Sequence, residues 1–171
     1  LDFIKLMNEK YEDFLYVFHS TKAQRSNLEK IINESQINNT EIISDDKIKD
    51  HILKKSIFAV SKSGTISLEI SKRKIPSIII YKMNFINFLI VKMLVKIKYA
   101  NILNIAAGQM IIPELLQSKC NHKEIYKLVS SFLEDPNKIK KQISNTEKVL
   151  ESFRTKNLPT DLAADVLMHK L

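Results

Sequence analysis

The stretch VSKSGTISLE, residues 60–69, places two hydroxyls, a glycine and a carboxylate close together in the sequence. Ser63 and Thr65 flank Gly64, which is one of only two glycines in 171 residues, and Glu69 follows roughly one helical turn later. A helix that begins here leaves its first backbone N–H groups unpaired, and together with the helix dipole they attract anions. Gly64 lets the backbone approach a phosphate closely, and the hydroxyls add donors. Phosphate donors followed by a carboxylate that can accept from a ribose diol form the arrangement that a nucleotide diphosphate needs.

The same residues also fit a purely structural role. Serine is a common N-cap, so Ser63 alone accounts for the start of a helix that has Gly64 and Thr65 in its first turn. A serine, a glycine and a threonine in a row form a weak motif. The spacing therefore leaves two interpretations open, a phosphate-binding loop and an ordinary helix cap.

The elements that must position these residues alternate between strands and helices. After a short helix pattern that includes Phe3, Ile4 and Met7, apolar runs rich in β-branched and aromatic residues predict buried strands, and segments of helical period separate them. The predicted strands are Phe14–Phe18, Glu41–Ser44, Ile57–Val60, Ile75–Tyr81 and, more weakly, Ile102–Ile105. The predicted helices between them are Ala23–Glu34, Asp46–Lys54, Thr65–Lys74 and Phe85–Tyr99. This order predicts an α/β fold, a Rossmann-like parallel sheet with right-handed crossovers and helices on both faces.

Beyond Gly108 the pattern becomes helical throughout. The predicted segments are Pro113–Ser118, Lys123–Leu133, Pro136–Arg154 and Asp161–Lys170. We therefore expect one domain over residues 1–157 and a helical C-terminal tail over residues 158–171, with TKNLPTD around Pro159 as the linker.

The predicted sheet indicates where a ligand would bind. In open parallel sheets, ligands bind beyond the carboxyl ends of the strands. The corresponding loops follow Phe18, Ser44, Val60, Tyr81 and Ile105. Both glycines of the chain, Gly64 and Gly108, fall in these loops, so the sequence predicts that they belong to one site.

Other polar residues near this edge have simpler explanations. Asp45 and Asp46 are typical of caps at a helix start, whereas Ser44 could contact a uracil base through its backbone. His19 follows the first strand and could reach a substrate, but it has no partner at triad spacing. The segment KCNH, residues 119–122, offers two side chains that bind zinc, too few for a zinc site. We therefore expect neither a metal nor a cofactor.

The composition limits the classes of partner. The formal charge of +8 comes almost wholly from lysine, and lysine lacks the bidentate geometry with which arginine reads bases and phosphates, so we expect no nucleic-acid partner. Attraction to an anionic membrane surface and a coding bias toward A and T both explain the lysine excess. The single cysteine, Cys120, cannot form an internal disulfide, which favours a reducing compartment such as the cytoplasm.

The most apolar stretch, Met83–Ala100, is interrupted by three lysines. It is shorter than the roughly 20 clean apolar residues that a membrane span needs. The helix predicted within it, Phe85–Tyr99, either lies on a membrane surface or is a crossover helix buried against the sheet. The sequence leaves both interpretations open.

Four motifs, in matching order and spacing, resemble the C-terminal half of the lipid-A-disaccharide synthases, a family of bacterial glycosyltransferases with the GT-B fold. They are SGTISLE at 63–69, IPSIIIYKM at 75–83, LVKIKYANILNIAAG at 94–108 and IIPELLQSKC at 111–120. The upstream part, Asp2–Val60, resembles the earlier βα units of the same domain, so the resemblance covers nearly the whole chain.

The resemblance implies a reaction and its substrates. The family is a hexosyltransferase that moves a diacylglucosamine unit from UDP-diacylglucosamine to a 1-phosphorylated diacylglucosamine acceptor, with release of UDP. The resemblance implies that Ser63, Gly64 and Thr65 bind the diphosphate of UDP and that Glu69 binds its ribose.

The third motif supplies the remaining site residues. Asn104 and Gly108 would form the loop that faces the sugar donor, with Asn104 as the catalytic candidate of this chain. Leu103 stands where the family usually has proline, so the shape of this loop departs from the family pattern.

The resemblance also implies that an N-terminal acceptor domain, which holds most catalytic groups in this fold, is absent from this chain. The chain opens without methionine inside a helical pattern, in line with a missing N-terminal part. We therefore expect a donor-binding part that is inactive alone, cytoplasmic, with peripheral contact to the inner membrane. Two alternatives are another GT-B transferase of UDP-sugars, such as the peptidoglycan enzyme, and a non-enzymatic basic module that docks on membranes through Phe85–Tyr99.

Overall fold

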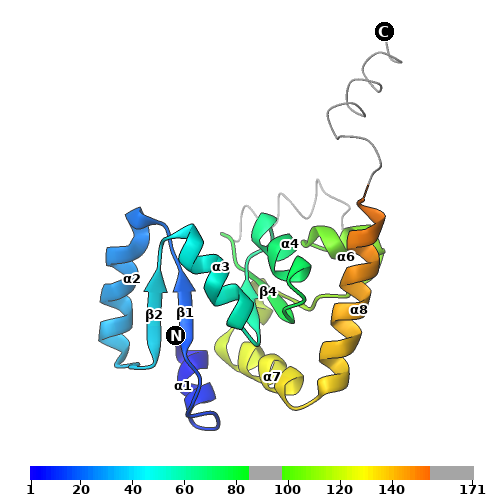
Figure 1. Cartoon of the computed structure of the whole chain (residues 1–171). Coiled ribbons are helices and arrows are strands. Elements are labelled where there is room, and N and C mark those ends of the chain that lie inside the picture. The colour runs from blue at the N-terminus through cyan, green and yellow to red at the C-terminus, as the bar shows by residue number, and fades with distance from the viewer. Residues whose placement is uncertain (85–97, 155–171) are drawn as a thin grey trace.

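The computed structural model describes residues 1–84 and 98–154 (Figure 1). Most of the predicted helix Phe85–Tyr99 and the whole predicted tail, including the boundary at residue 157, lie outside these ranges.

Strands and helices alternate through most of the chain. In order they are α1 (Asp2–Asn8), β1 (Tyr16–His19), α2 (Lys22–Ser35), β2 (Thr40–Ile43), α3 (Asp46–Lys55), β3 (Ala59–Ser61), α4 (Thr65–Lys72), β4 (Ser77–Tyr81), α6 (Ile102–Ala107), β5 (Glu114–Leu116), a 3₁₀ turn (Gln117–Lys119), α7 (His122–Leu133) and α8 (Pro136–Ser152). Side chains cap several helices as the sequence predicts; Asp45, for example, accepts from the backbone N–H groups of Lys47 and Ile48 at the start of α3.

The strands form two parallel sheets. One consists of β1 and β2, and the other has the order β3-β4-β5. Tyr16 pairs with Thr40 in the first sheet, and in the second Val60 pairs with Ile78 and Ile80 with Leu115. Among the described residues, no strand joins the two sheets.

Alternate residues of β4 face two separate hydrophobic clusters, as the two-residue period of a strand requires. Ile78 packs in a cluster with residues of α1 and α7, whereas Ile79 packs with Leu103 of α6. Leu68 of α4 and Val149 and Leu150 of α8 border the second cluster. Helices therefore cover both faces of this sheet, and the predicted Rossmann-like α/β fold is confirmed.

Helix α8 is tied to the sheet by a buried amide. The Gln142 side chain accepts from the backbone N–H of Ser77 at 2.7 Å and donates to its carbonyl at 2.9 Å. It thereby satisfies both backbone groups of the first residue of β4, which is buried.

Two short predictions near the C-terminal side were wrong. The run Ile102–Ile105, predicted as a strand, forms α6, because Asn101 caps it by accepting from the Leu103 N–H at 2.9 Å. The segment Pro113–Ser118, predicted as helical, contains β5, because the Pro113 carbonyl accepts from Ile79 and the chain continues the ladder beside β4. A run of four to six apolar residues has too few repeats to separate a buried strand from a buried helix.

Candidate functional site

The loop after β3 lies at the carboxyl edge of the three-stranded sheet. Helices α3 and α4 run side by side in the same direction (Figure 1), because Lys49 lies beside Glu69 and Asp50 beside Arg73. Each helix begins a few residues after the carboxyl end of a strand, α3 after β2 and α4 after β3. The carboxyl ends of both sheets therefore lie on the same side of the molecule, where ligands bind in this class of fold.

Gly64 has a backbone conformation that only glycine adopts readily. Its φ is 148° and its ψ is −166°, in a region essentially reserved for glycine. A Cβ atom added at this position would meet no heavy atom within 4 Å. The glycine is therefore required by the direction of the backbone as it enters α4, and the space beside it is open to a ligand.

Ser63 is not the cap of α4. The N-cap is Gly64, no side chain caps the helix, and the Ser63 hydroxyl instead donates to the Ala100 carbonyl at 2.7 Å. The simple cap interpretation of Ser63 was therefore wrong. The hydroxyl ties the loop after β3 to the segment that leads into α6.

A buried network holds the beginning of α4 in place. The Ser67 hydroxyl donates to the Gly64 carbonyl at 2.6 Å and accepts from the Asn101 side-chain amide at 2.9 Å. The Glu114 carboxylate accepts from the backbone N–H groups of Ala100 at 2.8 Å and Asn101 at 2.9 Å. Because Ser67, Asn101 and Glu114 are all buried, these hydrogen bonds fix the loop from beneath.

Asn104 belongs to the same network and is fully buried. Its amide nitrogen donates to the Ile112 carbonyl and to Glu114, both at 2.7 Å, and its oxygen accepts from the N–H groups of Ile111 and Ile112, both at 2.8 Å. These four bonds use both donors and both lone pairs of the amide. The structure thus brings Asn104 close to the predicted site, but its side chain has no hydrogen-bonding capacity left for a sugar.

Glu69 lies on α4 between two cations. Its carboxylate oxygens are 3.4 Å from Lys49 and 3.3 Å from Arg73, and its side chain is 28% exposed. Both distances belong to ion pairs rather than close hydrogen bonds, so the carboxylate retains lone pairs that can accept from hydroxyl groups. The neighbouring Asp50 is held more tightly, and its contacts with Lys54 and Arg73 lower its pKa to about 2.

Gly108 ends α6. It has φ 64° and ψ 7°, the left-handed conformation, and its N–H donates to the Ile105 carbonyl. This is a common glycine C-cap. Each of the two glycines therefore provides a backbone conformation with positive φ at a helix end, Gly64 at the start of α4 and Gly108 at the end of α6.

Three residues at this edge were missed as site candidates. Lys62 places its ammonium 5.1 Å from the centre of the Tyr81 ring, so the loop carries a positive charge beside the end of β4. Gln117, which has φ 52°, accepts from the Met83 N–H and donates to the Met83 carbonyl. The signal that could have found Lys62 and Tyr81 is their position at the carboxyl ends of predicted strands, since Lys62 follows Ile57–Val60 and Tyr81 ends Ile75–Tyr81. Gln117 gave no such signal, because the segment that contains it was predicted as helical.

His19 ends β1 at this edge, 4.0 Å from Asp46. A hydrogen bond from Lys49 lowers the pKa of Asp46, with a small contribution from His19. Ser44 has a buried hydroxyl without a partner among the described residues, and its predicted contact with uracil stays a prediction.

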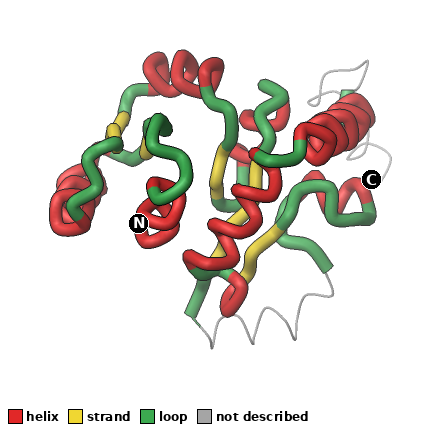
Figure 2. Tube along the Cα trace, turned by 90° about the horizontal axis from the view of Figure 1, so that it is seen from below, coloured by secondary structure: helices red, strands yellow, loops and turns green. Residues whose placement is uncertain are grey.

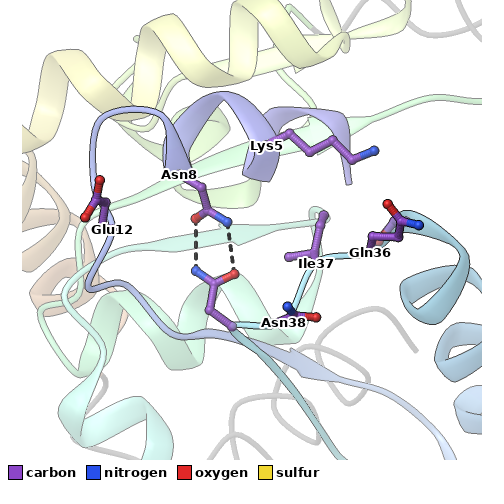
Figure 3. Close-up of a pocket in the computed structure, with 8 residues that line it drawn as sticks. Lys5, Asn8, Glu12, Gln36, Ile37 and Asn38 are labelled. Atoms are coloured by element: carbon purple, nitrogen blue, oxygen red, sulfur yellow. Dashed lines mark hydrogen bonds between the residues drawn. The ribbon is translucent and has the colours of Figure 1, made fainter.

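Two surface depressions lie elsewhere. The first lies between α1 and the segment before β2, at the amino ends of the strands, where Asn8 and Asn39 exchange hydrogen bonds at 3.0 and 2.9 Å (Figure 3). Lys5 and Glu12 also line it. The second lies beside β2 and reaches its carboxyl end, where Ser44 and Asp45 line it together with Lys22 and Arg25. Neither contains the Ser63–Thr65 loop.

Within residues 1–84 and 98–154, no three His, Cys, Asp or Glu side chains come together to hold a metal ion. No helix in the same ranges is long and apolar enough to cross a membrane.

The fold and the carboxyl edge of the three-stranded sheet together define a class of protein. It is a Rossmann-like α/β unit in which a glycine-containing loop and the start of a helix lie on the ligand side of a parallel sheet. Comparison with known sequences gives the family. The model of the lipid-A-disaccharide synthetase family matches residues 1–165, and the chain belongs to that family.

Several curated relatives are named lipid-A-disaccharide synthase. The protein from Rickettsia canadensis is 38% identical over 128 residues, which are 74% of this chain and 33% of the relative. The protein from Rickettsia prowazekii is 30% identical over 169 residues, 98% of this chain and 44% of the relative. One from a Sulfurihydrogenibium species is 42% identical over 105 residues, 61% of this chain and 27% of the relative. The chain thus spans less than half the length of these relatives.

Proposed function

We propose that this chain is the donor-binding part of a lipid-A-disaccharide synthase. It would bind UDP-diacylglucosamine, whose diacylglucosamine unit the complete enzyme transfers to a 1-phosphorylated diacylglucosamine acceptor with release of UDP. The family match over residues 1–165 supports this reaction over that of another GT-B transferase. Because the chain covers only part of its relatives, we expect binding without transfer from this chain alone.

One observation carries the proposal: the backbone at Gly64 is held in a glycine-only conformation, with open space beside it, at the start of α4. The first N–H groups of α4 have no side-chain cap. They can therefore donate to the diphosphate together with the hydroxyl of Thr65, which is exposed. Ser63 would contribute mainly by shaping the loop, since its hydroxyl already donates to Ala100.

The same donors suit the chemistry of transfer. As the glycosidic bond to UDP breaks, negative charge builds on the β-phosphate. A helix start already aimed at that charge stabilises it without reorganisation, and Lys62 adds a cation at the same edge. Glu69, oriented by Lys49 and Arg73, would accept from the ribose hydroxyls. We assign Asn104 to positioning the loop before β5, since its amide is saturated.

Substrates that carry acyl chains reside in or at a membrane. We therefore extend the proposal to a cytoplasmic protein that contacts the inner membrane peripherally. Binding of this chain to vesicles with anionic lipid, measured by sedimentation, tests this part. The net charge of +8 predicts that such binding weakens as salt is added.

The central test is the thermal stability of the 171-residue chain with and without UDP. We expect UDP to raise the melting temperature, and Glu69→Ala to remove most of that rise. Glu147→Ala is the matched control, because Glu147 is also a partly exposed glutamate paired with a lysine, Lys74, but lies on α8. No rise at millimolar UDP, or an equal loss in both variants, would count against the proposal.

A second measurement addresses the sugar. UDP-diacylglucosamine should compete for the same site more strongly than UDP-N-acetylglucosamine if the donor is acylated. The reverse order would favour the peptidoglycan type of transferase.

A further inference from the structure

Helix α6 carries apolar side chains on two opposite sides. Its inward side supplies Leu103 and Ala107 to the hydrophobic cluster that packs against β4. Its outward side carries Ile102 and Ile105, which are 48% and 43% exposed, and Ala106, which is also exposed. Residues three and four positions apart lie on one face of a helix, so these three side chains form a single surface, which we call the outer face of α6.

The outer face of α6 is not needed to cover the sheet. Helices lie on both sides of the strands in the view from below (Figure 2), and the two faces of β4 pack against different hydrophobic clusters. Single exposed apolar residues are common on protein surfaces. The outer face differs, because its two isoleucines lie one turn apart and because residues 99–113 form the longest run of the sequence without a charged side chain. Met110, in the same run, is also exposed.

The beginning of α6 touches the loop that we assign to the diphosphate. The Ser63 hydroxyl donates to the Ala100 carbonyl at 2.7 Å, and the Asn101 side-chain amide donates to Ser67 of α4 at 2.9 Å. Ile102 follows Ala100 by two residues, a distance along the chain of at most about 7 Å. The outer face of α6 therefore begins next to this loop.

The chemistry of the proposed donor identifies an occupant for this surface. In UDP-diacylglucosamine the sugar is bonded to the β-phosphate, and the two acyl chains are attached to the sugar. A diphosphate held at Gly64 and Thr65 therefore leaves the hydrocarbon chains only one sugar ring away from the loop. Ile102 lies next to that loop, so an acyl chain can leave the water by lying along the outer face of α6.

Two other occupants fit this surface less well. A helix that binds a membrane surface carries Lys and Arg on its polar face, whereas α6 has no charged residue. A stable protein interface covers about 800 Å² on each partner, far more than two isoleucines and an alanine provide. A hydrocarbon chain needs only a narrow apolar strip, and the outer face of α6 is such a strip.

We propose that the outer face of α6 binds an acyl chain of the donor, with Ile102 and Ile105 as the contacts, and thereby makes the site prefer an acylated sugar. The inference rests on the proposed function and adds the residues that recognise the chains. Each methylene group that moves fully from water into an apolar contact raises the affinity by about fourfold. The affinity for the donor should therefore increase with the length of its acyl chains, by less than this factor for each methylene on an open helix face.

The test measures how tightly the 171-residue chain binds UDP and UDP-glucosamine that carries two butyryl or two octanoyl chains. Dissociation constants are taken by calorimetry without vesicles or detergent. We expect the octanoyl compound to bind at least about tenfold more tightly than the butyryl compound. In a variant with both Ile102→Ser and Ile105→Ser, this gain should fall to about twofold or less. The affinity for UDP alone should stay the same, which also shows that the variant is folded.

The matched control replaces two exposed isoleucines elsewhere, with Ile31→Ser on α2 and Ile57→Ser before β3. These residues are 44% and 57% exposed, close to the values on α6. The control variant should keep the full gain with chain length. An equal gain in both variants, or an equal loss, would overturn the inference. A variant of α6 that keeps the gain but no longer sediments with anionic vesicles would overturn it too, because the outer face would then contact the membrane.

The same measurements separate failure of this inference from failure of the proposed function. If the chain binds UDP but its affinity does not change with acyl length, the nucleotide site stands and the outer face of α6 is not an acyl site. If the chain binds neither UDP nor the two acylated compounds, the proposed function falls and this inference falls with it. A dimer in light scattering that dissociates on Ile105→Ser would make a second copy the occupant and would also overturn the inference.

Discussion

The two glycines allow one experiment to separate a ligand-binding role from a purely conformational one. Gly64 and Gly108 both have positive φ, at 148° and 64°, and at both positions an added Cβ would meet no atom within 4 Å. Replacing either by alanine therefore costs backbone strain without a steric clash. For Gly64→Ala the cost is about 1–3 kcal/mol, and for Gly108→Ala about 1–2 kcal/mol.

These costs convert into measurable shifts. A loss of 1 kcal/mol lowers the melting temperature of a chain of this size by roughly 2–4 °C, so both variants should melt a few degrees lower. UDP at 100 times its dissociation constant would add about 2.7 kcal/mol of stability to a chain that binds it. We expect the unsubstituted chain and Gly108→Ala to show this rise in full, and Gly64→Ala to show little of it, because its loop no longer presents the start of α4 to the diphosphate.

The assay is a melting curve of each variant over a series of UDP concentrations, checked by calorimetry at one temperature. The reasoning is refuted if Gly64→Ala retains the full response to UDP, or if Gly108→Ala loses as much of it as Gly64→Ala. If Gly64→Ala and Gly108→Ala lose similar stability but only Gly108→Ala keeps the rise in melting temperature with UDP, then the nucleotide binds at Gly64.

Three other predictions follow from described contacts. Glu114→Gln replaces an acceptor oxygen by an NH₂ group that must face N–H donors, so it should lower the stability measured by urea unfolding by about 1–3 kcal/mol and weaken UDP binding as well. Gln142→Ala, which leaves two backbone groups of β4 unpaired, should cost a similar amount while the affinity for UDP stays unchanged. Asp50 has a pKa of about 2 in the folded chain against an ordinary value of 3.8, because of Lys54 and Arg73. Its contribution to stability is therefore complete above about pH 4 and lost as the pH falls toward 2, and Asp50→Asn should flatten acid unfolding in that window.

The sequence predicted the fold from its longer elements. Long apolar runs such as Ile75–Tyr81 and capped helices such as α3 carry enough local signal, and both were found. Ile102–Ile105 and Pro113–Ser118 were predicted with the wrong structure because periodicity shows neither a cap nor a strand pairing: Asn101 caps α6 and is itself held by Glu114, and pairing with β4 makes β5 extended. Periodicity cannot show contacts between residues distant in the sequence.

The candidate site shows the same division. The position of Gly64 after a strand and before a helix was visible in the sequence, and the structure places it there. What could not be predicted is the use of each polar side chain. Ser63 donates to the Ala100 carbonyl across the surface, and Asn104 points into the interior because the buried N–H groups of Ile111 and Ile112 need partners.

The loop at Gly64 is held by hydrogen bonds to its neighbours in the described structure. All of the described side-chain hydrogen bonds that hold the loop come from the side of β5 and α6, through Ser63, Ser67 and Asn101. Among the described residues, the opposite edge of β3 contributes no side-chain hydrogen bond to the loop. For this reason Glu114→Gln, which disturbs the network beneath the loop, should weaken UDP binding, whereas Gln142→Ala, which leaves that network intact, should not.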